Sequence, residues 1–151
     1  MSSEKAIITV LCMIWRNDEM LLQNRIAENW PGVTFPGGHV EPLESFVEAV
    51  KREMKEETGL TIANPRLCGV KQYQSDNDER YVVLLFKTNE FSGEVVSSRE
   101  GEMMWVKRDE IDAYPIAPDF KELLKVVDSN EYQELIYRPE VADIHQRIEL
   151  Y

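Results

Sequence analysis

Three glutamates in the middle of the chain have a spacing that suits a metal site. Glu53, Glu56 and Glu57 follow one another at i, i+3 and i+4, so on a helix their carboxylates project from one side. A cation held among them would relieve the repulsion between these like charges. Carboxylate oxygens suit Mg²⁺ or Mn²⁺, which keep several waters and take phosphate oxygens as further ligands. For the glutamates considered alone, the alternative is a solvated acidic helix face.

The residues around these glutamates complete a longer pattern. Residues 38–60 match G-x5-E-x7-R-E-U-x-E-E-x-G-U, where U is a bulky aliphatic residue. The specified positions are all filled, by Gly38, Glu44, Arg52, Glu53, Met54, Glu56, Glu57, Gly59 and Leu60. A chance match in a chain of this length is on the order of 1 in 10^8. The pattern resembles the signature of the Nudix hydrolases, which cleave nucleoside diphosphates linked to another group.

The resemblance implies roles for the motif residues that surround the three glutamates. It makes the carbonyl of Gly38 a candidate metal ligand, for which a simple tight turn is the alternative. It places Arg52 in the catalytic set as the orienting partner of a motif glutamate, and Glu44 behind it as a supporting residue. Neither of these two side chains is expected to touch the substrate.

The implied reaction is attack by water on a phosphorus atom of the diphosphate link, with metal ions bridging the phosphate oxygens. A general base must take the proton of that water. Three candidates stay open: Glu53 in the motif, and Glu100 and Glu102 on either side of Gly101. Glycine at position 101 would let this later loop approach the site. A solvated turn is the alternative for Glu100 and Glu102.

Outside the motif, the resemblance continues from about residue 6 to 128 and looks most like the MutT-type branch, the oxidised-nucleotide sanitisers. It rests there on residues 35–41 and 100–106. It implies an 8-oxo-dGTP-like nucleoside triphosphate as substrate, cleaved to the monophosphate and pyrophosphate. ADP-ribose, a nucleotide sugar, a dinucleoside polyphosphate or a capped RNA end are the alternatives, since branches that share the motif differ in their pockets. A nucleotide sensor without activity fits poorly with three retained glutamates.

A base pocket needs an aromatic or apolar clamp. Trp30, Phe35 and Tyr73 are the aromatic candidates for it. A place in the hydrophobic core is the competing interpretation of Trp30 and Phe35.

The polar candidates for substrate binding are Arg25, His39 and Asp119. Arg25 ends a predicted strand and could meet a phosphate, where an ordinary surface arginine is the alternative. His39 follows Gly38 and could face the site. Asp119 could read the edge of a base, or it could be the N-cap of a helix that follows Pro118.

Hydrophobic periodicity predicts the elements that position these residues. Strands are expected at residues 6–16, 20–25, 61–74, 80–88 and 103–107, and helices at 44–58 and 119–127. The first two strands form a hairpin around the turn at 17–19. In the motif helix, Val47, Val50 and Met54 form the predicted core-facing stripe, and Gly59 ends the helix.

This order of elements indicates an α/β fold, and the resemblance implies a Nudix-like α/β/α sandwich, with a mixed sheet and the motif helix packed on it. A length of 151 residues suits one domain, with a core at about residues 6–128 and a C-terminal extension at 129–151. That extension could pair as strands or be partly helical, and it could cover its own sheet or pack on a partner in a homodimer.

The charge and cysteine content of the chain limit the classes of binding partner and the compartment that we expect. The net charge of −11 argues against a nucleic-acid polymer or an anionic membrane surface. It leaves a nucleotide possible, because bound divalent cations reverse the local field. Cys12 and Cys68 are predicted to be two buried thiols of a protein in the reducing cytoplasm. The apolar run at residues 6–15 is too short to span a membrane.

Overall fold

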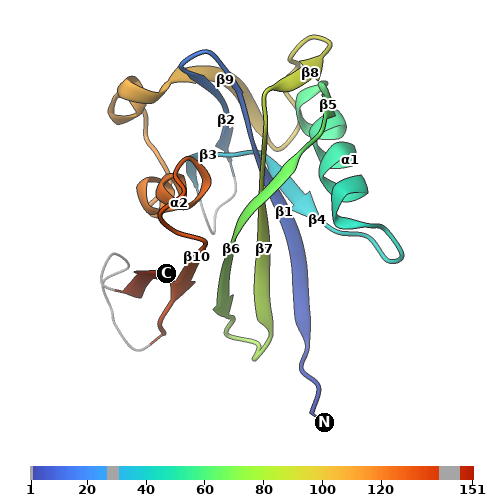
Figure 1. Ribbon diagram of the computed structural model, residues 1–151, viewed down its shortest axis with the longest axis vertical. Helices are drawn as coiled ribbons and strands as arrows, with labels where there is room; N and C mark the ends of the chain where they lie inside the picture. The colour runs from blue at the N-terminus through green and yellow to red at the C-terminus, as the bar shows by residue number, and fades with distance from the viewer. Residues whose placement is uncertain (1, 27–30, 140–146) are drawn as a thin grey trace.

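Strands are the main regular structure of the computed structural model, which describes residues 2–26, 31–139 and 147–151 (Figure 1). The elements in chain order are β1 (Ala6–Arg16), β2 (Glu19–Arg25), β3 (Gly32–Thr34), β4 (Gly37–His39), α1 (Phe46–Thr58), β5 (Thr61–Ala63), β6 (Arg66–Gln74), β7 (Arg80–Thr88), β8 (Glu90–Ser92), β9 (Gly101–Lys107), the 3-10 helix η1 (Arg108–Ala113), α2 (Phe120–Val127), β10 (Glu134–Tyr137) and β11 (Ile148–Leu150).

One mixed sheet organises the described part of the chain. Its strands follow the order β11-β10-β6-β7-β1-β2-β3, while β4 pairs with β1 and β9 with β2. Strand β1 is parallel to β7 and antiparallel to both β2 and β4. Because β1 pairs with β7 and β4 along one part and with β2 at its end, the sheet curls around it. The short strands β5 and β8 form a separate pair.

The two helices cover opposite faces of this sheet (Figure 1). Alternation along β1 shows how the faces divide: Cys12 and Ile14 join the buried cluster that contains α1 residues, whereas Met13 joins the cluster that contains α2 residues. Successive side chains of a strand point to opposite faces, so β1 contributes to both halves of the core. The α/β/α arrangement with the motif helix on the sheet is therefore confirmed.

The motif helix has defined ends. The hydroxyl of Ser45 accepts the backbone N–H of Glu48, and Gly59 closes the helix with a φ of 81°, a left-handed conformation that glycine adopts without strain. Val50 and Met54 are buried, as predicted, but Val47 is 42% exposed. The predicted stripe is wrong at Val47 because this residue lies in the first turn, ahead of the part that packs on the core.

Two other sequence predictions change in detail. The strand expected at residues 61–74 is divided into β5 and β6, because Asn64 has a left-handed φ of 49° and Pro65 has no N–H to donate. Cys12 is buried, whereas Cys68 is only partly buried, and both thiols are free. Among the described residues, no helix combines the length and the apolar character needed to cross a membrane.

The C-terminal extension takes the strand alternative. Strand β10 pairs in parallel with β6, and β11 pairs antiparallel with β10. Leu135 on β10 is fully buried in the same cluster as α2. The extension thus covers the edge of its own sheet, and packing against a second copy of the chain stays a prediction.

Candidate active site

The motif glutamates divide between two environments on α1. Glu53 and Glu57 are 8% and 7% exposed, on the side of the helix that faces the sheet, whereas the side chain of Glu56 is 55% exposed. Burial of two carboxylates on a helix face is costly unless they are paired or hydrogen-bonded. Their partners therefore define the site.

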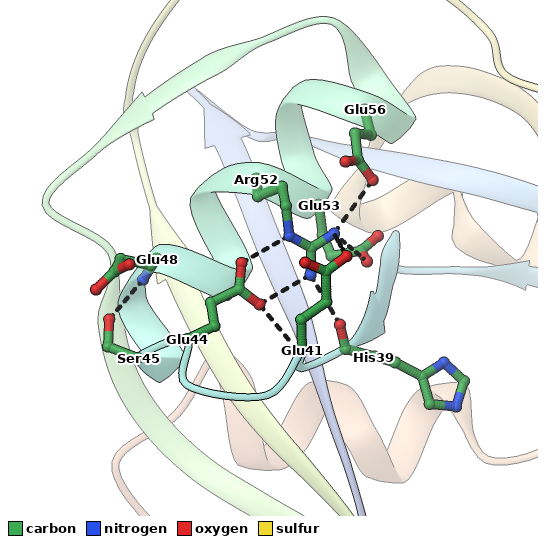
Figure 2. Close-up of polar contacts among 8 residues, drawn as sticks. All are labelled: His39, Glu41, Glu44, Ser45, Glu48, Arg52, Glu53 and Glu56. Atoms are coloured by element: carbon green, nitrogen blue, oxygen red, sulfur yellow. Dashed lines mark hydrogen bonds and ion pairs between the residues drawn. The ribbon is translucent and has the colours of Figure 1, made fainter.

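Arg52 joins α1 to the loop that precedes it (Figure 2). Its guanidinium donates to both oxygens of Glu44, at 2.6 and 2.9 Å, to Glu53 at 2.9 Å and to Glu56 at 3.2 Å. It also donates to the backbone carbonyl of His39 at 2.9 Å. The planar fork of arginine suits such a bidentate contact. One side chain thus sets the positions of two motif glutamates and of the loop.

Glu44 is the strongest partner of Arg52. It also accepts the backbone N–H of Glu41 at 3.0 Å. The hydrogen bonds from Arg52, followed by the one from Glu41, lower the pKa of Glu44 to about 2. Glu44 therefore stays ionised across the physiological range and holds Arg52 in place.

Gly38 lies directly against a motif carboxylate. A Cβ at this position would be 2.3 Å from the carboxylate of Glu53, a distance that no side chain permits. Glycine at position 38 therefore lets strand β4 lie against this carboxylate, and a larger residue would force Glu53 or β4 to move. Burial raises the pKa of Glu53, and Arg52 partly offsets that effect.

Glu57 has partners that the sequence analysis missed. Its Oε2 accepts a hydrogen bond from Nε2 of Gln23 at 3.2 Å and another from the hydroxyl of Ser98 at 2.8 Å. A signal existed for Gln23: it follows Leu21 by two residues on β2 and so faces α1. No comparable signal pointed to Ser98.

Glu100 is the residue that the tertiary structure adds to the motif. The side chain is exposed overall, but partial desolvation raises its pKa most and repulsion from Glu57 raises it further, while the charges of Arg25 and His39 act in the opposite direction. The hydroxyl of Ser98 links the backbone N–H of Glu100 to the carboxylate of Glu57. The neighbouring Glu102 is exposed as well and lies within β9.

Gly101 makes this approach possible. A Cβ at Gly101 would be 2.2 Å from the carbonyl oxygen of Asn24, and its φ is +156°. Strand β9 pairs with β2 at this point, with Gly101 opposite Arg25. The tight pairing places the preceding loop, with Glu100, beside the end of β2.

The predicted base-pocket residues lie on the other side of the sheet or in the core. Phe35 is buried, with its ring centroid 5.0 Å from that of Phe120, in line with the core alternative. Tyr73 stacks on Tyr81 at 5.1 Å. Trp30 lies outside the described residues.

Asp119 has a role that the sequence analysis did not foresee. It directly precedes α2, yet its side chain makes no capping hydrogen bond. Its carboxylate instead accepts a hydrogen bond from Lys71 at 2.6 Å, and both residues are buried. The N-cap alternative is therefore wrong for the side chain, because an ion pair with a residue 48 positions away takes its place.

The donor chemistry around α1 fits a hard divalent cation. Glu53, Glu57 and Glu100 offer carboxylate oxygens, the preferred ligands of Mg²⁺ and Mn²⁺. Repulsion between neighbouring carboxylates contributes to the raised pKa values of Glu53 and Glu100, and a bound cation would remove it. In the described part of the chain, no three acidic, histidine or cysteine side chains are already arranged as a metal-holding group.

Comparison with known proteins gives the same picture. The sequence model of the NUDIX domain matches residues 5–127. An uncharacterized Nudix hydrolase, YvcI of Bacillus subtilis, is 34% identical over 71% of this chain and 70% of its own length. An 8-oxo-dGTP diphosphatase of Haemophilus influenzae is 30% identical over 76% of this chain and 87% of its own. A CTP pyrophosphohydrolase of Escherichia coli is also 30% identical, over 76% and 85%.

The fold comparison reaches further along the chain than the sequence comparisons do. The crystal structure of a MutT protein from Bacillus halodurans superposes with a TM-score of 0.75 and 31% identity. The match covers 95% of this chain and 97% of that one, so it includes strands of the C-terminal extension.

Proposed function

This chain belongs to the Nudix hydrolase family, whose members are pyrophosphohydrolases, and we propose that it cleaves a nucleoside triphosphate to the monophosphate and pyrophosphate with the help of Mg²⁺ or Mn²⁺. The observation that carries the proposal is the pair of buried carboxylates on α1, Glu53 and Glu57, which Ser98 links to the loop of Glu100 next to Arg25 at the end of β2. These are the acidic and basic groups that a metal-bound polyphosphate needs.

Each of these residues has a place in the proposed reaction. Glu53, Glu56 and Glu57, with the carbonyl of Gly38, would hold the divalent cation. The cation, when bound, neutralises charge on the phosphate oxygens and on the leaving group. Arg25 ends β2 opposite Gly101, beside the loop that carries Glu100, and would meet a phosphate that enters there.

Among the three candidates for the general base, the geometry favours Glu100. The hydroxyl of Ser98 joins its backbone N–H to the carboxylate of Glu57, whereas Glu102 lies within β9 and Glu53 accepts a hydrogen bond from Arg52 at 2.9 Å. A raised pKa brings a carboxylate nearer to the operating pH, which improves it as a proton acceptor. Glu100 would therefore take the proton of the attacking water.

For the substrate, we propose an oxidised purine nucleotide such as 8-oxo-dGTP. The likeness to a MutT structure over 95% of the chain and to an 8-oxo-dGTP diphosphatase supports it. CTP is the second candidate, because a CTP pyrophosphohydrolase is related at the same identity. Tyr73, on the side of the sheet that α2 covers, is the described candidate for contact with the base, because Asp119 is buried in its ion pair with Lys71.

The test is a comparison of substrates at saturating Mg²⁺. The panel contains 8-oxo-dGTP, dGTP, CTP and the other nucleoside triphosphates, ADP-ribose, nucleotide sugars, diadenosine polyphosphates and capped RNA. We expect the highest kcat/KM for 8-oxo-dGTP, with pyrophosphate as the second product. A preference for CTP would replace the base assignment, and a preference for ADP-ribose or a capped RNA would overturn the triphosphate proposal. The Glu57→Gln variant supplies the background rate.

A further inference from the structure

Glu57 differs from Glu53 and Glu56 in the groups that donate hydrogen bonds to its carboxylate. Glu53 and Glu56 accept hydrogen bonds from the charged Arg52. Glu57 accepts from two neutral groups, the amide of Gln23 and the hydroxyl of Ser98, and both hydrogen bonds end on the same oxygen, Oε2. Neutral donors orient a carboxylate and leave its charge in place. This arrangement suits a carboxylate whose charge is needed by a cation.

Gln23 is held rigidly on the sheet. It lies near the end of β2 with its backbone opposite Thr34 of β3 on one side and Met103 of β9 on the other. Its side chain is 2% exposed and points to the face that α1 covers. Because strands on both sides fix its backbone and burial limits its rotamers, the amide can approach Glu57 from one direction only.

Ser98 approaches the same carboxylate from the loop before β9. Its hydroxyl donates to Glu57 at 2.8 Å and accepts the backbone N–H of Glu100 at 3.2 Å. Backbone hydrogen bonds between Ser98 and Gly101 close this loop on itself, at 3.3 Å in each direction. One hydroxyl therefore connects the motif helix to the segment that carries Glu100.

We infer that Gln23 and Ser98 are positioning residues of the metal site. By holding Oε2 of Glu57 from two sides, they aim its second oxygen at the divalent cation, and Ser98 also sets the spacing between Glu57 and Glu100. Hydrogen bonds behind a ligating carboxylate tune metal affinity in this way. The inference rests on the proposed function, since it assigns the two residues to the cation of that reaction.

The experiment measures Mn²⁺ binding to the full chain by electron paramagnetic resonance of the free ion, without substrate. Removing an outer partner of a metal ligand costs about 10- to 100-fold in affinity. We expect Gln23→Met and Ser98→Ala each to raise the Kd for Mn²⁺ at least about 10-fold. The double variant should lose less than the product of the two single effects, because both groups act on one oxygen. Ser98→Thr keeps the hydroxyl and should restore wild-type affinity.

Ser97→Ala is the matched control. Ser97 is the neighbouring residue of the same loop, but its hydroxyl accepts the backbone N–H of Met103 at 3.1 Å. Its removal should leave the Kd for Mn²⁺ unchanged. Melting temperatures of all variants separate a local effect from unfolding, and if Gln23→Met melts well below wild type, Ser98→Ala and Ser98→Thr decide the question.

The possible failures are distinct. If the wild-type chain binds Mn²⁺ and both Gln23→Met and Ser98→Ala bind it equally well, the positioning role is overturned while the proposed function stands. If Ser97→Ala weakens binding as much as Ser98→Ala, the effect belongs to the loop and the role is also overturned. If the wild-type chain neither binds Mn²⁺ nor hydrolyses any nucleotide of the panel, the proposed function fails as well.

Discussion

The helices α1 and α2 lie next to two regions whose charged residues are arranged differently. Next to α1, a single arginine, Arg52, forms ion pairs with three glutamates, Glu44, Glu53 and Glu56. The carboxyls of Glu57 and Glu100, next to each other, add further negative charge to this region. Next to α2, Lys71 and Asp119 form a buried pair of one positive and one negative charge.

From this difference we infer that the region beside α1 is the candidate catalytic site and that the ion pair beside α2 is a structural contact. The pair beside α2 is balanced, and the Lys71 ammonium lies 5.2 Å from the ring centroid of Tyr137. The carboxylates beside α1 outnumber the positive charges that pair with them. Repulsion between these carboxylates lowers the free energy of unfolding. We therefore expect losses beside α1 to reduce catalysis, and losses beside α2 to reduce stability.

The largest effect is expected at Glu57. Replacing it by Gln keeps the shape and one acceptor oxygen for the hydrogen bonds from Gln23 and Ser98, but it removes the charge that a bound cation would need. A metal ion contributes several kcal/mol of transition-state stabilisation, so kcat/KM should fall by about 10^3- to 10^4-fold. The thermal melt should stay at or above that of wild type. An unchanged rate would exclude Glu57 from the site.

The second prediction tests the opposite region. Lys71→Met leaves Asp119 buried without its cation, and breaking a buried ion pair costs about 3–5 kcal/mol in the free energy of unfolding. Chemical denaturation measures this loss. The double variant Lys71→Met, Asp119→Leu should recover most of it, because an apolar pair of similar volume replaces the ions. A full loss of activity in a stable double variant would instead place the pair in the substrate site.

Gly38→Ala gives a smaller loss beside α1. The added Cβ would meet the carboxylate of Glu53 at 2.3 Å, so β4 or the carboxylate must move. A displacement of about 1 Å in a catalytic group costs about 10²-fold in rate, which steady-state kinetics would detect. Gly93→Ala serves as the control: Gly93 has a φ of 98° and lies in a turn after β8, so its replacement should lower the melting temperature and leave kcat/KM unchanged.

The smallest effect is a gain in stability from Glu100→Gln. Its raised pKa means that the folded protein disfavours the charged form. Ionisation of Glu100 therefore lowers the free energy of unfolding at pH values above its folded-state pKa. Below the ordinary pKa of 4.5 the group is protonated in both states and this effect is absent. In metal-free buffer at pH 7, the variant should melt up to about 2 °C higher than wild type, and the gap should close towards pH 4.

Glu102→Gln is the comparison for that experiment. Glu102 is exposed like Glu100, but it lies on β9 and not in the loop that Ser98 links to Glu57, so the melting temperature should not change at either pH. A rise with Glu102→Gln equal to that with Glu100→Gln would show that overall negative charge, rather than the contact with Glu57, is responsible.

Local spacing in the sequence was sufficient for the motif helix and its ends. The i, i+3, i+4 spacing predicted which glutamates share a helix, and Gly59 marked where that helix stops. The prediction failed at Val47 because residue spacing shows the face of a helix but not how far the sheet extends beneath it. The hairpin of β1 and β2 also followed from a local turn.

The partners of these residues were decided by the tertiary structure. Gln23 and Ser98 lie 34 and 41 positions from Glu57, and Lys71 lies 48 positions from Asp119. Such contacts depend on the order of strands in the sheet, which no local spacing contains. The sequence by itself therefore determined the family, the motif helix and the charged groups of the candidate site. The tertiary structure alone decided that Glu100 lies near Glu57 and that Lys71 and Asp119 form a buried ion pair next to α2. The physical reason is that strand order and burial bring together residues that are far apart in the chain.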